Sequence, residues 1–150
     1  MTDEVLLDTN VLVYAFDPSE LTKHERALRV IARLLASGRG KISCQALGEF
    51  FWTVTRKMRP PLRPSEAYDQ IAILMRTWPV LPTTPLVVLE AARGVRDHRL
   101  PYWDAQVWAA ARLNQIPVIL SEDFSDGSEV DGVRFVNPFV RTFDWGLLGT

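Results

Sequence analysis

The sequence predicts a single α/β domain over residues 1–150, in which helices cover both faces of a mostly parallel sheet. Three observations predict this class. Short apolar runs typical of buried strands alternate with longer segments whose apolar residues recur at helical spacing. The 150 residues are 47% hydrophobic and 23% charged, which suits one globular domain. The 10 prolines and 8 glycines are scattered, so no linker divides the chain.

The first third of the chain predicts a strand, a helix and a second strand. Residues 4–7 form an apolar run that ends in polar residues, which is typical of a buried strand entering a turn. In residues 21–37 the apolar positions recur at helical spacing, and the glycines that follow are expected to end the helix. Residues 41–43 are a short strand candidate.

The middle of the chain predicts three helices and one more strand. Apolar residues in 45–58 fall on one helical arc, and a pair of prolines ends this helix. A second helix is expected over residues 65–76, followed by a short strand at 80–81. Thr84 suits the N-cap of the third helix, which begins with a proline and reaches about His98.

The last third begins with a helix over residues 103–114, which Pro101 introduces. Residues 117–120 form another buried type of strand, and residues 133–136 form the last one after two turns at Asp-Gly pairs. The expected sheet therefore has four to five short strands. In parallel sheets of this kind, ligands bind beyond the carboxyl ends of the strands.

Charge and cysteine content exclude some classes of protein. Seventeen basic and 18 acidic residues give a net charge of −1, so the overall charge does not indicate nucleic-acid binding. The single cysteine, Cys44, cannot form an internal disulfide. No apolar run approaches the roughly 20 residues of a membrane span, and acidic residues stand where a signal peptide would be basic. We therefore expect a soluble, cytoplasmic protein.

Three acidic residues are expected at one edge of the sheet. Asp8 and Asp123 follow two predicted strands, and Asp104 lies at the start of the helix over residues 103–114. Each acid also has a structural interpretation, as an Asx-turn residue, a loop acid in water or a helix N-cap. Carboxylates that share a cleft repel one another and stay ionised only when cations neutralise them. Together the three acids favour a cation site.

The residues and motifs that the sequence lacks exclude several kinds of metal site and active site. Oxygen ligands favour Mg²⁺ or Mn²⁺ over Zn²⁺, and there is no Cys/His cluster of zinc spacing; His24 and His98 stand alone. The acidic residues between 122 and 131 do not match an EF-hand loop. The sequence has neither a phosphate-binding glycine loop nor a G-x-S-x-G elbow.

Several stretches, in this order and spacing, resemble PIN-domain ribonucleases and, within that family, the VapC toxins of bacterial toxin–antitoxin pairs. The matching stretches are Leu7–Leu12, Ser43–Phe50, Tyr102–Ala105 with Ala109–Ala111, Ser121–Asp123 and, as in one VapC subgroup, Asp131–Phe139. The resemblance spans nearly the whole chain. It implies a three-layer α/β/α PIN-like fold and a metal-dependent endoribonuclease that hydrolyses RNA phosphodiesters with metal-activated water.

The resemblance also implies which residues carry the chemistry. An acidic quartet falls on Asp8, Glu49, Asp104 and Asp123, of which Glu49 is identified by the resemblance alone. We expect Asp8 and Asp104 to contact Mg²⁺ or Mn²⁺ directly, and the other two acids to position the metal or water. Asn10 could orient Asp8, and Ser121 could hydrogen-bond a carboxylate. The neighbouring Glu122 should point elsewhere on an extended backbone.

RNA contacts must come from local basic and aromatic residues. The candidates for phosphate contact are Arg56, Arg93, Arg96 and Arg99. A second group of arginines, at positions 26, 29 and 33, suits either RNA contact or a solvated helix face, and the solvated face is the preferred interpretation. The aromatic residues Trp52, Tyr102 and Trp103 suit either base stacking or core packing.

The partners follow from the resemblance, which implies a homodimer and a VapB-type antitoxin. An apolar C-terminal segment, with Phe139, Phe143, Trp145, Leu147 and Leu148, would suit such an interface or would pack on its own domain. A non-catalytic PIN-fold module that binds RNA or protein is the alternative function, and a DNA nuclease is a third.

Overall fold

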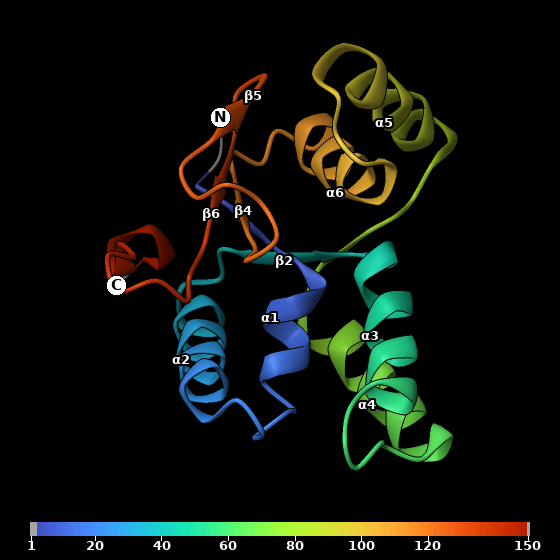
Figure 1. The fold of residues 1–150 in the computed structure, drawn as a ribbon, viewed down its shortest axis with the longest axis vertical. Coiled ribbons are helices and arrows are strands. Elements are labelled where there is room, and N and C mark those ends of the chain that lie inside the picture. Colours follow the sequence, from blue (N-terminus) through green and yellow to red (C-terminus); the bar gives the residue numbers. More distant parts are fainter. Residues whose placement is uncertain (1–2, 150) are drawn as a thin grey trace.

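A six-stranded sheet forms the centre of the molecule, which the computed structural model describes over residues 3–149 (Figure 1). The strands are β1 (Val5–Leu7), β2 (Gly40–Ser43), β3 (Val80–Leu81), β4 (Val118–Leu120), β5 (Glu129–Val130) and β6 (Val133–Val136). Their order is β3-β2-β1-β4-β6-β5, and only β5 runs antiparallel to its neighbour. The mostly parallel sheet is therefore confirmed, but the expected number of strands was too low.

The additional strand and a short helix were missed for the same reason, which is their length. Strand β5 has only two residues, on the edge of the sheet. Helix α1 (Thr9–Tyr14) has six residues and begins directly after β1, where the polar sequence predicted a turn. The Asp8 carboxylate caps this helix by accepting a hydrogen bond from the Thr9 N–H, 2.8 Å away. Segments this short have too few positions for a periodic pattern.

The five longer helices are confirmed, with small shifts at their ends. They are α2 (Leu21–Ser37), α3 (Cys44–Arg56), α4 (Pro64–Thr77), α5 (Pro85–His98) and α6 (Tyr102–Leu113). The expected end signals act as predicted: Thr84 caps α5 through its side chain, and Gly38 ends α2 in the left-handed conformation, with φ of 72°. A 3₁₀-helix, Trp145–Leu148, follows near the C-terminus.

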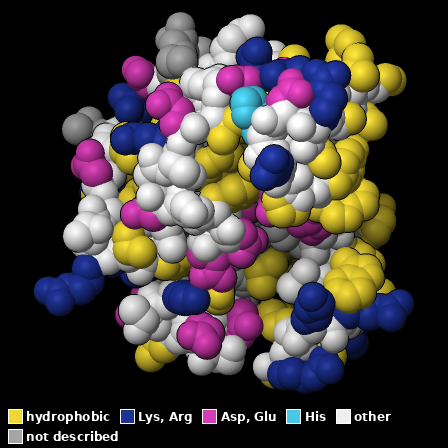
Figure 2. All heavy atoms as spheres, turned by 45° about the horizontal axis from the view of Figure 1, so that its top comes forward, with side chains coloured by type: hydrophobic (Ala, Val, Ile, Leu, Met, Phe, Trp, Pro, Cys, Tyr) yellow, Lys and Arg dark blue, Asp and Glu magenta, His cyan; other side chains and the backbone are white. Residues whose placement is uncertain are grey.

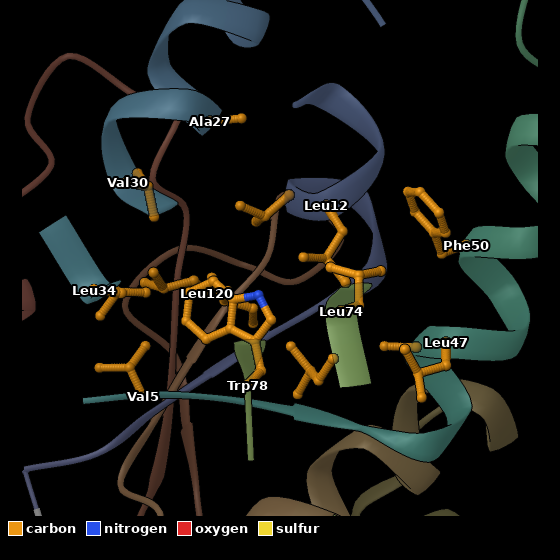
Figure 3. Close-up of a cluster of buried hydrophobic side chains, with 14 of the residues drawn as sticks. Val5, Leu12, Ala27, Val30, Leu34, Leu47, Phe50, Leu74, Trp78 and Leu120 are labelled. Atoms are coloured by element: carbon orange, nitrogen blue, oxygen red, sulfur yellow. The ribbon is translucent and has the colours of Figure 1, made fainter. Parts of the chain in front are cut away.

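Helices cover both faces of the sheet and enclose two separate apolar cores. Helices α1 to α4 lie on one face, where Val5 of β1 shares a core with residues such as Leu12 and Phe50 (Figures 1 and 3). Helices α5 and α6 lie on the other face, where Leu6 meets Trp108. Successive strand residues thus point into opposite cores, as the pleat of a strand requires. The predicted three-layer α/β/α arrangement is confirmed.

Close packing of α5 on α6 places the start of α6 at the edge of the sheet. The Trp108 ring lies against Gly94, where a Cβ atom would stand 2.8 Å from the ring. The Trp108 indole N–H donates to the Val130 carbonyl oxygen, 3.0 Å away. Because the ring is fully buried, α6 is held in one position relative to α5 and β5.

The C-terminal segment packs on its own domain. Phe143 and Leu148 are buried in the same core as α2. The Arg26 guanidinium donates to two carbonyl oxygens of this segment, and the Arg29 guanidinium lies 4.2 Å from the Trp145 ring centre. Arg33 also donates to the segment. The interpretation as a solvated face was therefore wrong for Arg26 and Arg33, which bind the end of the chain to α2, whereas Arg29 is exposed.

Within residues 3–149, no helix combines the length and apolar character needed to cross a membrane.

Candidate active site

Asp8 and Ser121 lie side by side because β1 and β4 are adjacent parallel strands. Leu7 pairs with Leu120, and the Asp8 N–H donates to the Leu120 carbonyl oxygen at 3.0 Å. The residues that follow these two strands therefore meet at the carboxyl edge of the sheet. Glu49 from α3 and Asp104 from the first turn of α6 approach the same edge from opposite layers.

Asp8 is the most enclosed of the four acids, with a relative exposure of 6%. Its carboxylate accepts hydrogen bonds from the Thr9 N–H, at 2.8 Å, and from the Ser121 hydroxyl, at 2.7 Å. Burial above all, together with the nearby charges of Asp123 and Glu49, nevertheless raises the pKa of Asp8 to about 6, although the two hydrogen bonds lower it. Near neutral pH the site therefore holds a carboxylate whose charge is poorly compensated.

Ser121 links Asp8 to Asp123. Its hydroxyl donates to Asp8 and accepts from the Asn10 amide, at 3.0 Å, and from the Asp123 N–H, at 3.1 Å. The Asn10 amide also donates to the Asp123 carboxylate, at 3.1 Å. Asn10 thus orients Asp123 directly and reaches Asp8, the residue that it was expected to orient, through Ser121.

Glu49 is held by two side chains. The Thr9 hydroxyl donates to its Oε2 at 2.9 Å, and the Gln45 amide, one helical turn earlier, donates to its Oε1 at 2.6 Å. The polar face of α3 therefore lines the site, as the family resemblance implied. Sequence reasoning assigned no role to Thr9, and its contact with Glu49 joins residues 40 positions apart, which no local pattern reports.

Asp104 lies within the first turn of α6 and not at its N-cap, which is Pro101. In the described part of the chain, no group donates a hydrogen bond to its carboxylate or forms an ion pair with it. Partial burial raises the pKa of Asp104, and the charges of Asp123 and Glu49 add to this effect. Asp104 is thus close enough to Asp123 and Glu49 for their charges to act on it.

Two of the four acids, Glu49 and Asp123, border a hollow of about 310 Å³. It is lined by Thr9, Asn10, Val13, Tyr14, Asp17, Glu49, Thr53 and Asp123. Acidic side chains gather beside a hollow near the middle of the face shown in Figure 2. Glu122 turns away from the quartet, as expected, and binds the Tyr14 hydroxyl at 2.6 Å and the Lys23 ammonium at 2.8 Å. Lys23 is thus paired with Glu122.

No lysine or arginine between residues 3 and 149 forms an ion pair with the quartet. The donors are all oxygens, and burial and mutual repulsion raise the pKa values of Asp8 and Asp104. Such a set fits a hard divalent cation. In the described residues, however, no three acidic, histidine or cysteine side chains form a ready metal cluster. Glu49 and Asp123 are instead turned to hydrogen-bond donors.

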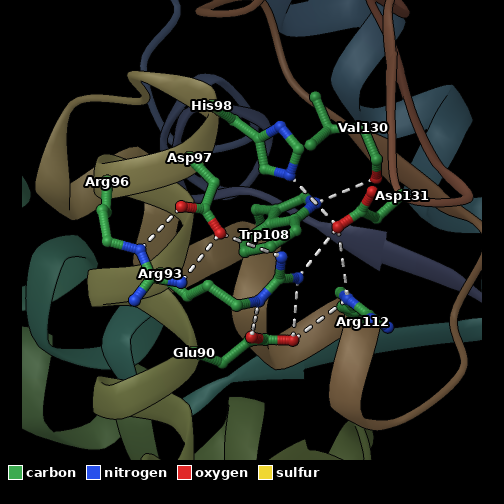
Figure 4. Close-up of polar contacts among 9 residues, drawn as sticks. All are labelled: Glu90, Arg93, Arg96, Asp97, His98, Trp108, Arg112, Val130 and Asp131. Carbon is green, nitrogen blue, oxygen red and sulfur yellow. Dashed lines mark hydrogen bonds and ion pairs between the residues drawn. The ribbon is translucent and has the colours of Figure 1, made fainter.

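The arginines proposed for RNA contact fall into two groups. Arg93 lies in a cluster of ion pairs with Glu90 and Asp131, and Arg96 pairs with Asp97 (Figure 4). Arg56 and Arg99 are exposed.

The aromatic candidates and the two histidines also occupy different environments. Trp52 and Trp103 are 51% and 65% exposed, whereas Tyr102 is half-buried and donates to Gln106. Of the two histidines, His98 contacts Asp131 and packs against the Trp108 ring. His24 contacts the Tyr14 carbonyl oxygen.

Comparison with known proteins identifies the class to which this fold and site belong. The sequence matches the family model described as PIN domain over residues 5–126. The chain therefore belongs to the PIN domain family. A search of curated protein sequences finds no match to this chain.

Solved structures of toxin–antitoxin proteins share the fold. A toxin–antitoxin complex from Klebsiella pneumoniae matches with a TM-score of 0.65 and 15% identity, covering 90% of this chain and 98% of that one. The Mycobacterium tuberculosis toxin VapC20, which cleaves the sarcin–ricin loop, matches with a TM-score of 0.60 and 17% identity, over 77% and 87%. DNA-bound VapBC from Salmonella typhimurium matches with a TM-score of 0.59 and 17% identity, over 90% and 98%.

Proposed function

We propose that this chain, as a single PIN domain over residues 1–150, is a metal-dependent endoribonuclease and a VapC-like toxin. The observation that carries the proposal is the acidic quartet, whose four carboxylates share one site without a basic partner in residues 3–149. Mutually repelling acids at the carboxyl edge of a parallel sheet lower the stability of the fold unless a cation binds there. Membership of the PIN domain family and the shared fold of VapC structures support the same function.

Asp8 and Asp104 would hold Mg²⁺ or Mn²⁺, with Glu49 and Asp123 positioning the ion or a water molecule. Such an ion, when bound, neutralises the carboxylates and lowers the pKa of water. The Ser121 hydroxyl and the Thr9 N–H fix the orientation of the Asp8 carboxylate. Asn10 fixes Asp123 in the same way. These contacts pre-organise the acids for a negatively charged substrate.

The reaction is the hydrolysis of an RNA phosphodiester. Water adds to phosphorus in line with the bond to the 3′ oxygen, and this bond breaks as the new one forms. The products are a 5′-phosphate and a 3′-hydroxyl. For RNA positioning we propose Arg56, Arg93, Arg96 and Arg99, with stacking of unpaired bases on the exposed rings of Trp52 and Trp103. At Arg93 and Arg96, phosphate must compete with carboxylates that are already bound.

The first experiment is cleavage of a mixed cellular RNA pool by the purified protein in Mg²⁺, Mn²⁺ or EDTA, beside Asp104→Asn prepared in the same way. We expect metal-dependent cuts that are absent in the variant, and sequencing the new ends identifies the target. DNA of the same sequence tests the alternative nuclease. If wild type and variant are equally inactive after any bound partner is stripped away, the non-catalytic binding module becomes the better proposal.

We further propose that the protein acts in the cytoplasm as a homodimer and that a VapB-type antitoxin neutralises it. The structures of toxin–antitoxin complexes that share the fold support the antitoxin. The apolar C-terminal segment does not support the dimer, because it packs on its own domain. Light scattering tests the dimer, and a monomer at micromolar concentration contradicts it. Co-expression with the product of an adjacent gene tests the antitoxin, and failure to co-purify contradicts it.

A further inference from the structure

A chain of hydrogen bonds joins α6 to α3 beside the acidic quartet. The Tyr102 hydroxyl donates to Gln106 Oε1 at 2.9 Å, and Gln106 Nε2 donates to Gln45 Oε1 at 3.0 Å. Gln45 Nε2 then donates to Glu49 Oε1 at 2.6 Å. We call Tyr102, Gln106 and Gln45 the amide relay. It ends on one of the four acids of the proposed active site.

The direction of every hydrogen bond in the amide relay is fixed at its Glu49 end. A carboxylate only accepts hydrogen bonds, and so does the Trp103 carbonyl oxygen, which lies 3.1 Å from the same Gln45 nitrogen. Gln45 must therefore turn its oxygen toward Gln106. Gln106 must donate with its nitrogen and accept from Tyr102 with its oxygen. Each amide has only one orientation that satisfies its neighbours, which makes the relay a rigid link.

The amide relay crosses between the two layers of the fold. Helix α3 packs against α1 and α4 and contributes Phe50 to one core, whereas α6 packs against α5 and contributes Trp108 to the other. Glu49 belongs to the first layer and Asp104 to the second. The hydrogen bond from Gln106 to Gln45 and that from Gln45 to Trp103 join these layers at the carboxyl edge of the sheet.

Gln106 is an unusual residue for its place on α6. Its relative exposure is 8%, and the residues on either side of it, Ala105 and Val107, are buried as well. A buried amide without partners costs about 1–3 kcal/mol, whereas an apolar side chain of similar size carries no such cost. The amide is therefore not explained by core packing, and it donates a hydrogen bond out of α6 to Gln45.

We propose that Gln106 is a positioning residue that acts through Gln45 to hold the Glu49 carboxylate at a fixed place relative to Asp104. The two carboxylates repel each other, and they stand on helices from different layers, so without a rigid link the gap between them widens. The inference rests on the proposed nuclease function. It adds that the Glu49 side of the site depends on a glutamine in the opposite layer.

The test replaces the amide with an apolar group of similar size, in Gln106→Leu. Kinetics on a defined RNA should show kcat lowered about tenfold, with KM within about twofold of wild type, because Gln106 touches no substrate. A readout without RNA is the Mn²⁺ concentration that gives half of the maximal thermal stabilisation. It should rise about tenfold. Gln70→Leu on α4, the same change outside the amide relay, should leave kcat and this concentration at their wild-type values.

A spectroscopic readout shows whether the amide relay itself is broken. The chain has four glutamines, at positions 45, 70, 106 and 115, so NMR of glutamine side-chain amides gives few signals. Gln106→Leu should move the Gln45 amide signals, and Gln70→Leu should not. Tyr102→Phe removes only the hydroxyl at the far end of the relay, and we expect kcat to fall about threefold.

The outcomes separate the relay from the nuclease. If Gln106→Leu folds and moves the Gln45 signals, yet kcat and the half-stabilising Mn²⁺ concentration stay within about twofold of wild type, the relay proposal is overturned. If Gln106→Leu does not fold, Tyr102→Phe decides: a threefold fall in kcat at unchanged KM supports the relay, and wild-type kinetics overturn it. If wild type neither cleaves RNA nor gains stability from Mn²⁺, the proposed function fails, and the relay proposal fails with it.

Discussion

Two groups of acidic residues in the molecule have opposite electrostatic environments: one is paired with arginines, and the other is not. Between α5, α6 and β5, Glu90, Asp97 and Asp131 pair with three arginines (Figure 4). The pKa values of Glu90 and Asp131 lie below their usual range because Arg93 donates to both. The quartet at the carboxyl edge of the sheet has no such partners in residues 3–149, and the pKa values of Asp8 and Asp104 are raised.

This difference distinguishes acids that stabilise the fold from acids that lower its stability. A carboxylate whose pKa falls on folding adds to the free energy of unfolding at neutral pH, and one whose pKa rises subtracts from it. The Arg93 cluster therefore stabilises the contact between α5, α6 and the edge of the sheet. The carboxylates of the quartet repel one another in the folded state, and a bound cation would remove this repulsion. Each of the following predictions tests this contrast.

The largest expected effect is on catalysis. Asp104→Asn should lower kcat/KM for RNA cleavage more than about 100-fold, because it removes a charged oxygen of the proposed metal site. The matched control is Asp69→Asn, the same change at an exposed position on α4, which should cleave like wild type. Circular dichroism and an unfolding curve check that both variants fold. Full activity of a folded Asp104→Asn variant would contradict the assignment of Asp104 to the metal site.

The second prediction concerns a divalent cation alone. Mn²⁺ at about 100 times its dissociation constant should raise the free energy of unfolding by about 2.7 kcal/mol, because it binds only the folded site. Asp104→Asn should lose most of this gain, whereas Asp69→Asn should keep it. Thermal unfolding across a Mn²⁺ titration, with Ca²⁺ and NaCl at matched ionic strength, measures the effect. Equal stabilisation of all three proteins would place the ion elsewhere.

The third prediction is that removing a charge from the quartet stabilises the metal-free protein. Burial raises the pKa of Asp8 to about 6, so its folded-state penalty is absent below pH 3.8 and complete above pH 6. Asp8→Asn in EDTA should therefore raise the free energy of unfolding by about 2 kcal/mol at pH 7.5, and by much less at pH 4.5. Urea unfolding at both pH values measures this. If the variant is less stable than wild type at pH 7.5, the charge of Asp8 does not destabilise the metal-free fold, and the prediction is wrong.

The fourth prediction applies the same chemical change to the Arg93 cluster, with the opposite result. Arg93 and Arg112 both bind the Glu90 carboxylate, whose pKa is lowered chiefly by the hydrogen bond from Arg93. Its stabilising effect is present at neutral pH and is lost as the pH falls through the lowered pKa. Glu90→Gln should thus lower the free energy of unfolding by about 1–2 kcal/mol at pH 7.5. An unchanged unfolding curve would show that the ion pairs contribute nothing.

The long elements of the fold could be predicted from the sequence, and the short ones could not. Helices α2 to α6 have enough turns for their apolar positions to show a helical period. Helix α1 does not, and its polar start was interpreted as a turn. It is helical because Asp8 caps it and because Val11 and Leu12 are buried in the core, which is a tertiary effect.

Part of the site could be predicted from strand order and from the position of Asp104 at the start of a helix. Asp8 and Asp123 end strands, so their meeting at one edge follows from a parallel sheet. Glu49 was identified through family resemblance, because a polar helix face looks the same whether it lines a groove or faces water. The contacts of Gln45 with Gln106 join residues 61 positions apart. One signal was present: Gln106 is a polar residue within the apolar stretch of α6.

The smallest expected effect separates a free arginine from a paired one. In residues 3–149 no carboxylate forms an ion pair with Arg56, whereas Arg96 is bound to Asp97 at 2.6 Å. A phosphate can bind Arg56 without displacing another anion, but at Arg96 it must compete with Asp97.

Arg56→Ala should therefore weaken binding of a single-stranded RNA about threefold and reduce the salt dependence of binding by about one ion. Arg96→Ala should have a smaller effect on both. Fluorescence anisotropy from 50 to 200 mM salt, with Asp104→Asn as the non-cleaving background, measures these differences. An equal loss of RNA affinity in the two variants would mean that the ion pair with Asp97 does not weaken the binding of RNA by Arg96. The contrast between compensated and uncompensated charges would then apply to the acids of this protein but not to its arginines.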